Sequence, residues 1–414
     1  MVAVELRGFT RLTLDGIAGL VDVVEGVHHN IAGGPGLFGV STHGRARGLT
    51  GLVYRNIRRV VALVDRALGL SLASLEPVAS AASAAPRQET LRAIANGVLG
   101  DHLARTKNPL ATCMQLRYDG RPLELTAKGL KAAIPQATGK LVVLAHGLCM
   151  HDLQWKRRGH DHGAALSSNL GYTPVYLRYN SGLHVSVNGR QLAGQLEALL
   201  KAWPVRVNEL ALVGHSMGGL VFRSACHYGA EAGHAWRRRL GALVFLGTPH
   251  HGAPFERGGN WVHLLLDRSP YVAPLARLGR IRSAGITDLR YGNVFDEDWH
   301  RHDRFERSGD RRRAAGLPEG VACFTIAATT GRRGRNLRGR LMGDGIVPLA
   351  SALGLHADQS RALRFPGSRR WIGYGMGHLD LLSRPEVYER IERWLRPAVP
   401  VRARRRTRRR SSES

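Results

Sequence analysis

Residues 210–223 read LALVGHSMGGLVFR, and a serine there stands between glycines where an apolar run ends. The run 210–213 has the length and composition of a short buried parallel strand. Gly218 and Gly219 follow Ser216, and the apolar residues after them continue as a helix does. A sharp strand-to-helix turn strains the serine backbone and requires small residues two positions before and after it. The pattern therefore predicts a serine hydroxyl above the edge of a sheet, at a helix N-terminus that favours negative charge.

The five-residue pattern G-x-S-x-G occurs easily by chance in a chain with 50 glycines, so its surroundings matter more than the pattern itself. From about residue 87 to residue 396, strand-like runs alternate with helical ones, and Asp119-Gly120 is typical of a hairpin turn. This alternation predicts an α/β fold with a mostly parallel sheet flanked by crossover helices. The expected strands are 141–145, 174–179, 209–213, 242–247 and 321–330, and the expected helices include 88–106 and 189–203.

A serine hydroxyl is a weak nucleophile unless a base removes its proton and an acid orients that base. In this type of sheet both partners follow later strands, in the order serine, acid, histidine. Asp344 stands between two glycines after the last expected strand, and His378 stands in a glycine-rich loop before the final helical pattern. We predict Asp344 as the acid and His378 as the base. Asp380 is a rival acid, and His356 is a rival base.

The tetrahedral intermediate of acyl transfer needs two N–H donors aimed at its developing negative charge. The N–H of Met217, directly after the serine, is one predicted donor. The second is expected from the loop after the strand at 141–145, where Gly147 permits a close approach and the N–H of Leu148 donates. His146 in the same loop is interpreted as a structural residue that shapes the loop.

The charge of the chain indicates its surface partners. Its 414 residues include 60 lysines and arginines, mostly arginines, against 32 acidic residues, for a formal net charge of +28. A coding bias and selection for a polyanionic partner both explain this skew. The charge favours adhesion to an anionic membrane surface or to nucleic acid, but no nucleic-acid-binding signature is present. We therefore predict no specific nucleic-acid partner.

The sequence also bears on compartment and metals. No run of 18 apolar residues occurs, which argues against a membrane span, and the N-terminus lacks a signal-peptide pattern. We expect a cytoplasmic protein, with a peripheral position at the inner membrane as an option. Four widely spaced cysteines predict reduced thiols, and His250-His251 has no third ligand pattern nearby. We expect neither a metal ion nor a cofactor, and the oligomeric state stays open.

Composition divides the chain into regions. Residues 1–86 contain two amphipathic helical patterns and a linker, which predict either a membrane-surface helix pair or a hairpin packed on the rest of the chain. Residues 87–400 form the expected α/β catalytic domain, with a helical cap insert at about 254–318. Residues 401–414 carry seven arginines and are expected to be a disordered tail.

Six stretches, in this order, resemble bacterial lipases and esterases of the α/β-hydrolase superfamily: LVVLAHGL, LRYNSGLH, GHSMGGL, LGTPHHGAP, GDGIVPL and GMGHLDLL. The lipase-like group akin to the GPI inositol-deacylases is similar too, and the resemblance covers about residues 140–396. It implies an α/β-hydrolase fold and ester hydrolysis through an acyl-serine intermediate. The roles it implies are Ser216 as nucleophile, Asp344 as acid, His378 as base, and Leu148 and Met217 as oxyanion-hole donors.

The insert after LGTPHHGAP is the expected place for substrate binding. Trp261, Leu264 and Leu265 are candidates to line an acyl pocket, with the alternative that they only pack a small cap. A hydrophobic lid beside a basic surface suits a lipid-like carboxylic ester. The alternative function is a non-catalytic scaffold of the same fold that binds membrane or polymer surfaces. A serine, an acid and a histidine in this order argue against that alternative.

Overall fold

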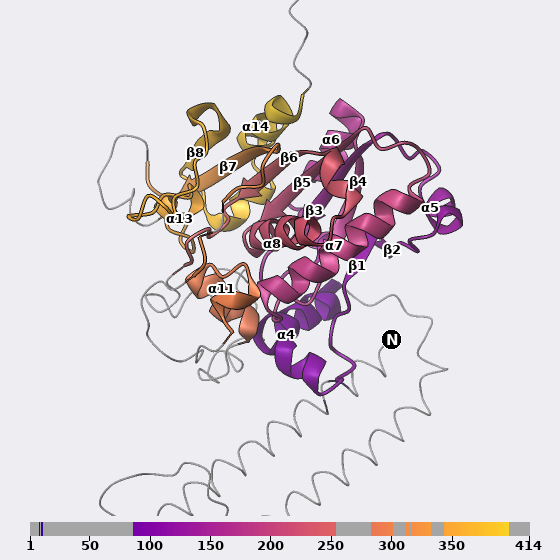
Figure 1. Ribbon diagram of the computed structural model, residues 1–414, viewed down its shortest axis with the longest axis horizontal. Helices are drawn as coiled ribbons and strands as arrows, with labels where there is room; N and C mark the ends of the chain where they lie inside the picture. Colours follow the sequence, from indigo (N-terminus) through magenta and orange to yellow (C-terminus); the bar gives the residue numbers. More distant parts are fainter. Residues whose placement is uncertain are drawn as a thin grey trace, which may run out of the picture.

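The computed structural model describes residues 86–253, 283–300, 312–314, 316–332 and 343–396, together with residues 8 and 10. Its strands form one sheet in the order β2-β1-β4-β3-β5-β6-β7-β8 (Figure 1). β1 pairs antiparallel with β2 and β4, and the other neighbours run parallel. The strands are β1 (Gln115–Tyr118), β2 (Arg121–Pro122), β3 (Lys140–Ala145), β4 (Thr173–Arg178), β5 (Glu209–His215), β6 (Leu240–Leu246), β7 (Ala322–Thr329) and β8 (Arg370–Tyr374).

The mostly parallel sheet predicted from the alternating pattern is confirmed. The expected strands agree with β3 to β7 to within one or two residues at each end. Asp119 and Gly120 join β1 to β2 with φ values of 46° and 71°, as a two-residue hairpin turn requires. β8 was not expected. It lies at the edge of the sheet, where its residues are only partly buried, and it therefore has no continuous apolar run.

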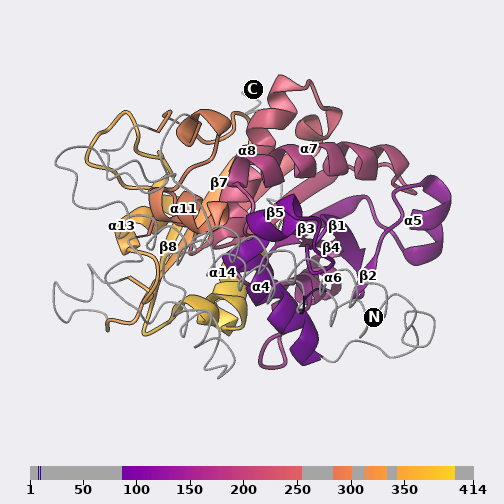
Figure 2. The ribbon, with the colours of Figure 1, turned by 90° about the horizontal axis from the view of Figure 1, so that it is seen from below.

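Helices cover both faces of this sheet (Figures 1 and 2). The α-helices are α4 (Pro86–Arg105), α5 (Ala127–Ala133), α6 (His162–Leu170), α7 (Val185–Ala202), α8 (Met217–Glu231), α11 (Ala284–Tyr291), α13 (Leu349–Ala352) and α14 (Pro385–Leu395). The 3-10 helices are η1 (Asp152–Trp155), η2 (Ala235–Arg239), η4 (Asp296–Asp298), η5 (Gly367–Arg369) and η6 (His378–Leu382).

The central strands are buried on both sides, which explains their apolar sequences. Leu141 and Val143 of β3 pack in one core cluster with α7 and α8. Val142 and Leu144 point the other way and pack with residues of α6 and α14. Because successive strand residues face opposite sides, a strand covered on both faces is apolar throughout. The alternation of hydrophobic and polar residues that marks a half-exposed strand is therefore absent here.

α14 shows how a helix on one of these faces is encoded. Pro385 occupies its first turn, where a missing N–H costs no hydrogen bond. Val387, Ile391 and Leu395 recur every four residues, and all three side chains are buried against the sheet. The arginines and glutamates between them lie on the outer side, so one stripe of this short helix meets the core.

α4 packs against loops at the carboxyl ends of the strands. A Cβ placed on Gly97 would lie 2.9 Å from the Cα of Cys149, and one on Gly100 would lie 1.9 Å from the side-chain oxygen of Asn180. The hydroxyl of Ser283 donates to the carbonyl of Gly97 over 2.7 Å, which ties α4 to the start of α11 (Figure 1). Both glycines thus permit close contact between this helix and the edge of the sheet at which α8 begins.

Several predicted regions lie outside the described residues. They are the segment 1–86 apart from residues 8, 10 and 86, most of the insert at 254–318 with Trp261, Leu264 and Leu265, and the tail 401–414. Their domain boundaries stay predictions. In the part of the chain that the structure describes, no helix has the length and apolar character needed to cross a bilayer.

Candidate active site

Ser216 is the single residue between the end of β5 at His215 and the start of α8 at Met217. Its φ of 53° and ψ of −121° lie in a region that residues with a side chain seldom adopt. Its N–H donates to the carbonyl of Leu246, at the end of the neighbouring strand β6, over 2.8 Å. The residue is 1% exposed. The end of the strand, the start of the helix and the neighbouring strand together hold this serine in its strained conformation.

Small residues on both sides make the turn sterically feasible. A Cβ on Gly214 would lie 2.6 Å from the backbone nitrogen of Gly219, and a Cβ on Gly218 would lie 2.4 Å from the carbonyl oxygen of Ala145. Both separations are shorter than real Cβ atoms tolerate, so neither position accepts even alanine without a shift of the backbone. The spacing read in the sequence, glycine two residues before and after the serine, has this steric origin.

Asp344 and His378 are brought together from two loops. Nδ1 of His378 lies 2.7 Å from Oδ2 of Asp344, and the backbone N–H of His378 donates to the carbonyl of Asp344 over 3.2 Å. The other carboxylate oxygen of Asp344 accepts the N–H groups of Ile346 and Val347 over 3.0 and 2.8 Å. Both side chains are almost fully buried. The carboxylate is thus fixed by its own turn and receives the Nδ1–H of the imidazole, which leaves Nε2 as the basic nitrogen.

The imidazole of His378 lies beside the turn that carries the serine. A Cβ on Gly247 would lie 3.1 Å from Cε1 of His378, so the ring packs on this glycine. Gly247 directly follows Leu246, the residue that accepts the N–H of Ser216. Nε2 of His378 is buried and has no hydrogen-bond partner among the described residues. The serine turn and the basic nitrogen therefore meet at the end of β6.

The loop after β3 runs against the serine. A Cβ on Gly147 would lie 3.1 Å from the Cβ of Ser216, so only a glycine allows this approach without displacement. Leu148, the next residue, is fully buried. Met217 is the first residue of α8, and the first N–H groups of a helix have no acceptor within it. The two predicted donor residues thus flank Ser216 from two different segments.

His146 shapes this loop, as interpreted from the sequence. Its Nδ1–H donates to the carbonyl of Gly147 over 2.8 Å, and its ring stacks on Tyr179 with the ring centroids 4.4 Å apart. The Tyr179 hydroxyl donates to the carbonyl of His146 over 2.8 Å. Burial lowers the pKa of His146 to about 3, so the ring is neutral in ordinary buffers. His146 is therefore a neutral residue whose ring and carbonyl group both make contacts that hold the loop after β3 in place.

The sequence analysis missed His215. Its Nε2–H donates to the backbone carbonyl of His378 over 3.2 Å, and the two rings lie 4.6 Å apart. Burial, followed by the proximity of His378, holds the pKa of His215 well below its ordinary value. His215 is the last residue of β5, so it ties the strand before Ser216 to the loop of His378. Its position next to the serine was the available signal.

The rival residues have other partners. Oδ1 of Asp380 pairs with Arg158 over 2.8 Å, and its Oδ2 accepts the N–H of Gly377 over 2.9 Å. Nδ1 of His356 accepts the N–H of Asp358 over 3.0 Å. The carboxylate that meets the ring of His378 is that of Asp344. Among the described residues, no group of three or more histidine, cysteine, aspartate or glutamate side chains is arranged to hold a metal ion.

The strand order, the parallel pairing and the strained turn after β5 define the α/β-hydrolase fold. Within it, residues 136–312 match the family described as the PGAP1-like alpha/beta domain, which confirms the resemblance inferred from the motifs. No curated protein matches the chain.

Several solved structures are similar to the chain. The mature form of the Bacillus licheniformis lipase BlEst2 is 17% identical, with 68% of this chain and 96% of that chain covered and a TM-score of 0.39. Aspergillus fumigatus lipase B is 13% identical, with 68% and 55% covered and a TM-score of 0.37. A thermophilic esterase from Thermogutta terrifontis is 16% identical, with 63% and 90% covered and a TM-score of 0.35.

Proposed function

We propose that the protein is a serine hydrolase of carboxylic esters. One observation carries the proposal. The imidazole of His378 donates Nδ1–H to the buried carboxylate of Asp344, while its Nε2 is buried without a described partner beside the turn of Ser216. A basic nitrogen oriented in this way next to a serine in a strained strand-to-helix turn is what activation of a hydroxyl requires.

The reaction follows from these positions. Oγ of Ser216 attacks the ester carbonyl carbon while Nε2 of His378 takes the hydroxyl proton, and Asp344 stabilises the imidazolium. The N–H groups of Leu148 and Met217 stabilise the negative charge on the former carbonyl oxygen. The intermediate collapses to an acyl-serine, and the alcohol leaves with the proton from His378. Water, deprotonated by His378, then releases the acid and restores the serine.

A lipid-like acyl group is the substrate class that we infer. The segment NWVHLLL within the insert is rich in large apolar residues, and Trp261, Leu264 and Leu265 are its candidates for an acyl pocket. The net charge of +28 supports an encounter with an anionic membrane surface, where such esters reside. The two features together favour a long-chain ester over a small water-soluble one.

A panel of p-nitrophenyl esters tests this proposal. Purified full-length protein should hydrolyse octanoyl and palmitoyl esters at least as well as the acetyl ester. Ser216→Ala should abolish the reaction, and Ser224→Ala, a matched substitution at a buried serine of the helix that follows, should retain it. A rate confined to the acetyl ester contradicts the lipid-like substrate, and equal rates for Ser216→Ala and Ser224→Ala contradict the serine mechanism.

A further inference from the structure

Two loops leave neighbouring strands at the edge of the sheet where α8 begins. The loop after β3 carries Leu148, a predicted oxyanion-hole donor, and the loop after β4 belongs to the stretch LRYNSGLH, residues 177–184. β3 and β4 run parallel, with Ala145 paired to Leu177, so the two loops start side by side. The second loop supplies no reacting group to the proposed chemistry, and its polar side chains bond to the first loop instead.

Residues 147–150 form a turn that sets the direction of the Leu148 N–H. The N–H of Met150 donates to the carbonyl of Gly147 over 3.4 Å, and the Nδ1–H of His146 donates to the same carbonyl over 2.8 Å. A trans peptide group is planar, and its C=O and N–H point in opposite directions. Because two donors hold this carbonyl, the N–H in the same peptide group is held as well. No described backbone carbonyl accepts that N–H.

Cys149 is the strained residue of this turn. Its φ of 59° is left-handed, at the third position of the four-residue turn, where type II turns require a positive φ and usually have glycine or asparagine. A Cβ makes this conformation costly for a cysteine. The residue is 3% exposed, and α4 packs on its side chain at Gly97. The turn therefore needs contacts from outside to stay in this conformation.

Ser181 supplies such a contact from the loop after β4. Its Oγ accepts the N–H of Cys149 over 3.1 Å, and the residue is 1% exposed. Tyr179, two residues earlier, donates its hydroxyl proton to the carbonyl of His146 over 2.8 Å. These two bonds fix residues 146–149 at both ends, with the predicted oxyanion-hole donor between them. Removal of the serine hydroxyl would leave a buried N–H without its acceptor.

The loop that carries Ser181 is itself fixed by two helices. The side-chain amide of Asn180 donates to the carbonyl of Gly100 on α4 over 3.0 Å, and its oxygen accepts the N–H of Gly182 over 3.0 Å. The N–H of Gly285 on α11 donates to the carbonyl of Gly182 over 3.1 Å. Because these contacts hold the loop in place, the serine hydroxyl can impose a position on the turn that it bonds.

We propose that Ser181 is a positioning residue of the oxyanion hole, whose hydroxyl holds the strained turn at Cys149 and thereby keeps the N–H of Leu148 directed at the serine site. The hydroxyl takes no part in the reaction and acts through the turn. The effect on rate rests on the proposed ester hydrolysis. The dependence of the turn on Ser181 is independent of catalysis.

Loss of this hydroxyl should affect the transition state more than the bound substrate. Oxyanion-hole bonds act on the charge that develops during the reaction, so a displaced donor lowers kcat and changes KM little. Ser181→Ala should lower kcat on p-nitrophenyl butyrate roughly 10- to 100-fold, less than the roughly 100- to 1,000-fold loss that follows deletion of a donor. Titration with a fluorophosphonate counts the active sites, so that an inactive fraction does not lower the measured kcat.

Ser186→Ala is the matched control. Ser186 is also 1% exposed, and its Oγ accepts the indole N–H of Trp299 over 3.0 Å. It lies on α7, outside both loops. The control thus loses a buried serine hydroxyl with the same role as an acceptor, and its kcat should be unchanged. Should Ser181→Ala fail to fold, Ser181→Cys replaces it, because a thiol is close in size to a hydroxyl but a weak acceptor.

Removal of the strain at Cys149 should rescue the loss. Glycine adopts a φ of about 60° without penalty, so the turn in Cys149→Gly should depend less on the bond from Ser181. Ser181→Ala should therefore lower kcat by a smaller factor in the Cys149→Gly background than in the unchanged protein. The ratio of the two factors measures the coupling between the hydroxyl and the strained residue.

Alkylation of Cys149 by iodoacetamide measures the turn without catalysis. Burial raises the pKa of this thiol to about 12, so it reacts when the structure opens locally. Mass spectrometry of the digested protein gives the rate at each cysteine separately. Ser181→Ala should raise the rate at Cys149 roughly five-fold or more, because loss of one buried hydrogen bond favours opening by about that factor.

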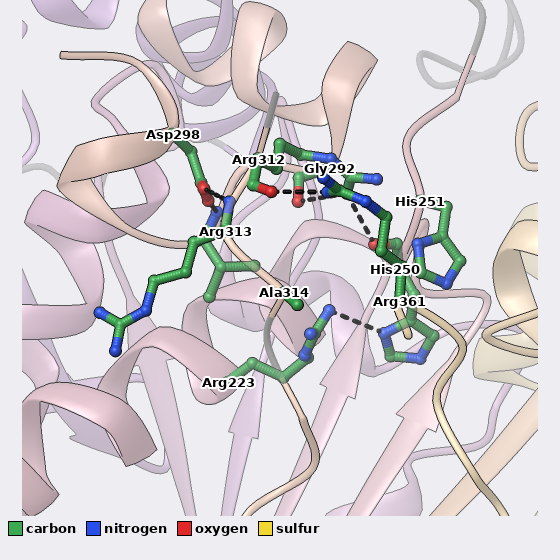
Figure 3. A pocket seen from close by; sticks show the side chains of 10 residues that line it. Arg223, His250, His251, Gly292, Asp298, Arg312, Arg313, Ala314 and Arg361 are labelled. Atoms are coloured by element: carbon green, nitrogen blue, oxygen red, sulfur yellow. Dashed lines mark hydrogen bonds between the residues drawn. The ribbon is translucent and has the colours of Figure 1, made fainter. Parts of the chain in front are cut away.

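Cys226 is the internal reference for this measurement. It is 2% exposed, and burial raises its pKa to about 12 as well. It lies on α8 three residues after Arg223, whose side chain points toward His250 in the loop after β6 (Figure 3). Its rate of alkylation should be the same in the unchanged protein, in Ser181→Ala and in Ser186→Ala.

Three outcomes overturn the proposal. The first is an equal rate of Cys149 alkylation in Ser181→Ala and Ser186→Ala. The second is an active protein in which Ser181→Ala leaves kcat unchanged. The third is an equal loss of kcat with and without Cys149→Gly. A protein that hydrolyses no ester contradicts the proposed function instead, and the alkylation of Cys149 then decides alone whether Ser181 holds the turn.

Discussion

At the scale of single residues, the proposed chemistry depends on which nitrogen of the His378 imidazole carries the proton. Asp344 accepts Nδ1–H of His378 with one oxygen, and two backbone N–H groups hold the other oxygen. This arrangement leaves Nε2 as a base. The proposed mechanism therefore requires the carboxylate of Asp344 for two properties, its negative charge and its inability to donate a hydrogen bond.

Asparagine has nearly the same size and shape as aspartate but is neutral and can donate, so Asp344→Asn tests the charge and the accept-only character of this side chain separately from its size. The amide nitrogen of the introduced side chain would donate to Nδ1 of His378 and so move the ring proton to Nε2, which then could not accept the proton of Ser216. We expect Asp344→Asn to lower kcat on p-nitrophenyl butyrate by roughly 10⁴-fold, with little change in melting temperature. Asp358→Asn, at an exposed carboxylate, is the matched control. Equal kcat values for the two variants would contradict the assignment.

A site residue could be predicted from the sequence when its neighbours along the chain or its order among the motifs indicate its role. It could not be predicted when its role depends on a contact between distant segments. The glycines around Ser216 and their steric purpose follow from the pattern of a strand-to-helix turn, and Asp344 and His378 follow from their order in the chain. The contact of His215 with the carbonyl of His378 has no local signature, since it depends on how two loops meet.

At the scale of elements, α4 illustrates the limit of helical periodicity. The helix was expected, and the structure has it at nearly the same bounds. A periodic pattern does not say which partner the helix packs on. That partner is the set of loops at the carboxyl ends of the strands, reached through Gly97 and Gly100. β8 is the opposite case, because an edge strand that is partly exposed gives a weak apolar signal.

Two glycine substitutions test whether the close packing of α4 on the loop of Cys149 contributes to stability and activity. A Cβ on Gly97 would lie 2.3 Å from Sγ of Cys149, in the loop that follows Leu148. Gly97→Ala should destabilise the protein by roughly 1–3 kcal/mol through overpacking and lower kcat by displacing that loop. Gly194→Ala, on the exposed side of α7 with no atom in reach, should stabilise it by roughly 0.5–1 kcal/mol.

Urea unfolding and ester hydrolysis measure both effects. A shift of stability in the same direction for Gly97→Ala and Gly194→Ala would contradict the close packing of α4 on the loop of Cys149.

At the scale of the whole molecule, buried neutral histidines couple stability to pH. Burial lowers the pKa of His146 to about 3 and that of His162 to about 4, and it holds those of His215 and His250 well below the ordinary value. In the unfolded chain each of these rings takes up a proton near pH 6.5. The unfolded state therefore binds more protons between the two pKa values, and stability decreases as the pH is lowered through that window.

We expect the free energy of unfolding to be steady above about pH 6.5 and to fall steeply toward pH 4. His162 alone contributes a loss of roughly 3 kcal/mol over this range, since each pKa unit corresponds to about 1.4 kcal/mol. His162→Gln should flatten the pH dependence measured by urea unfolding between pH 7 and pH 5. His300→Gln, at an exposed position, should leave the slope unchanged. An unchanged slope for His162→Gln would contradict a buried neutral ring.

The most direct test of the central claim is covalent labelling with a fluorophosphonate, located by mass spectrometry of the digested protein. A serine activated by His378 and Asp344 should carry a single adduct on the peptide that contains Ser216. The adduct should be absent in Ser216→Ala and form far more slowly in Asp344→Asn. A protein that hydrolyses p-nitrophenyl butyrate while its adduct lies on another residue, or while Ser216→Ala is fully active, would contradict the account.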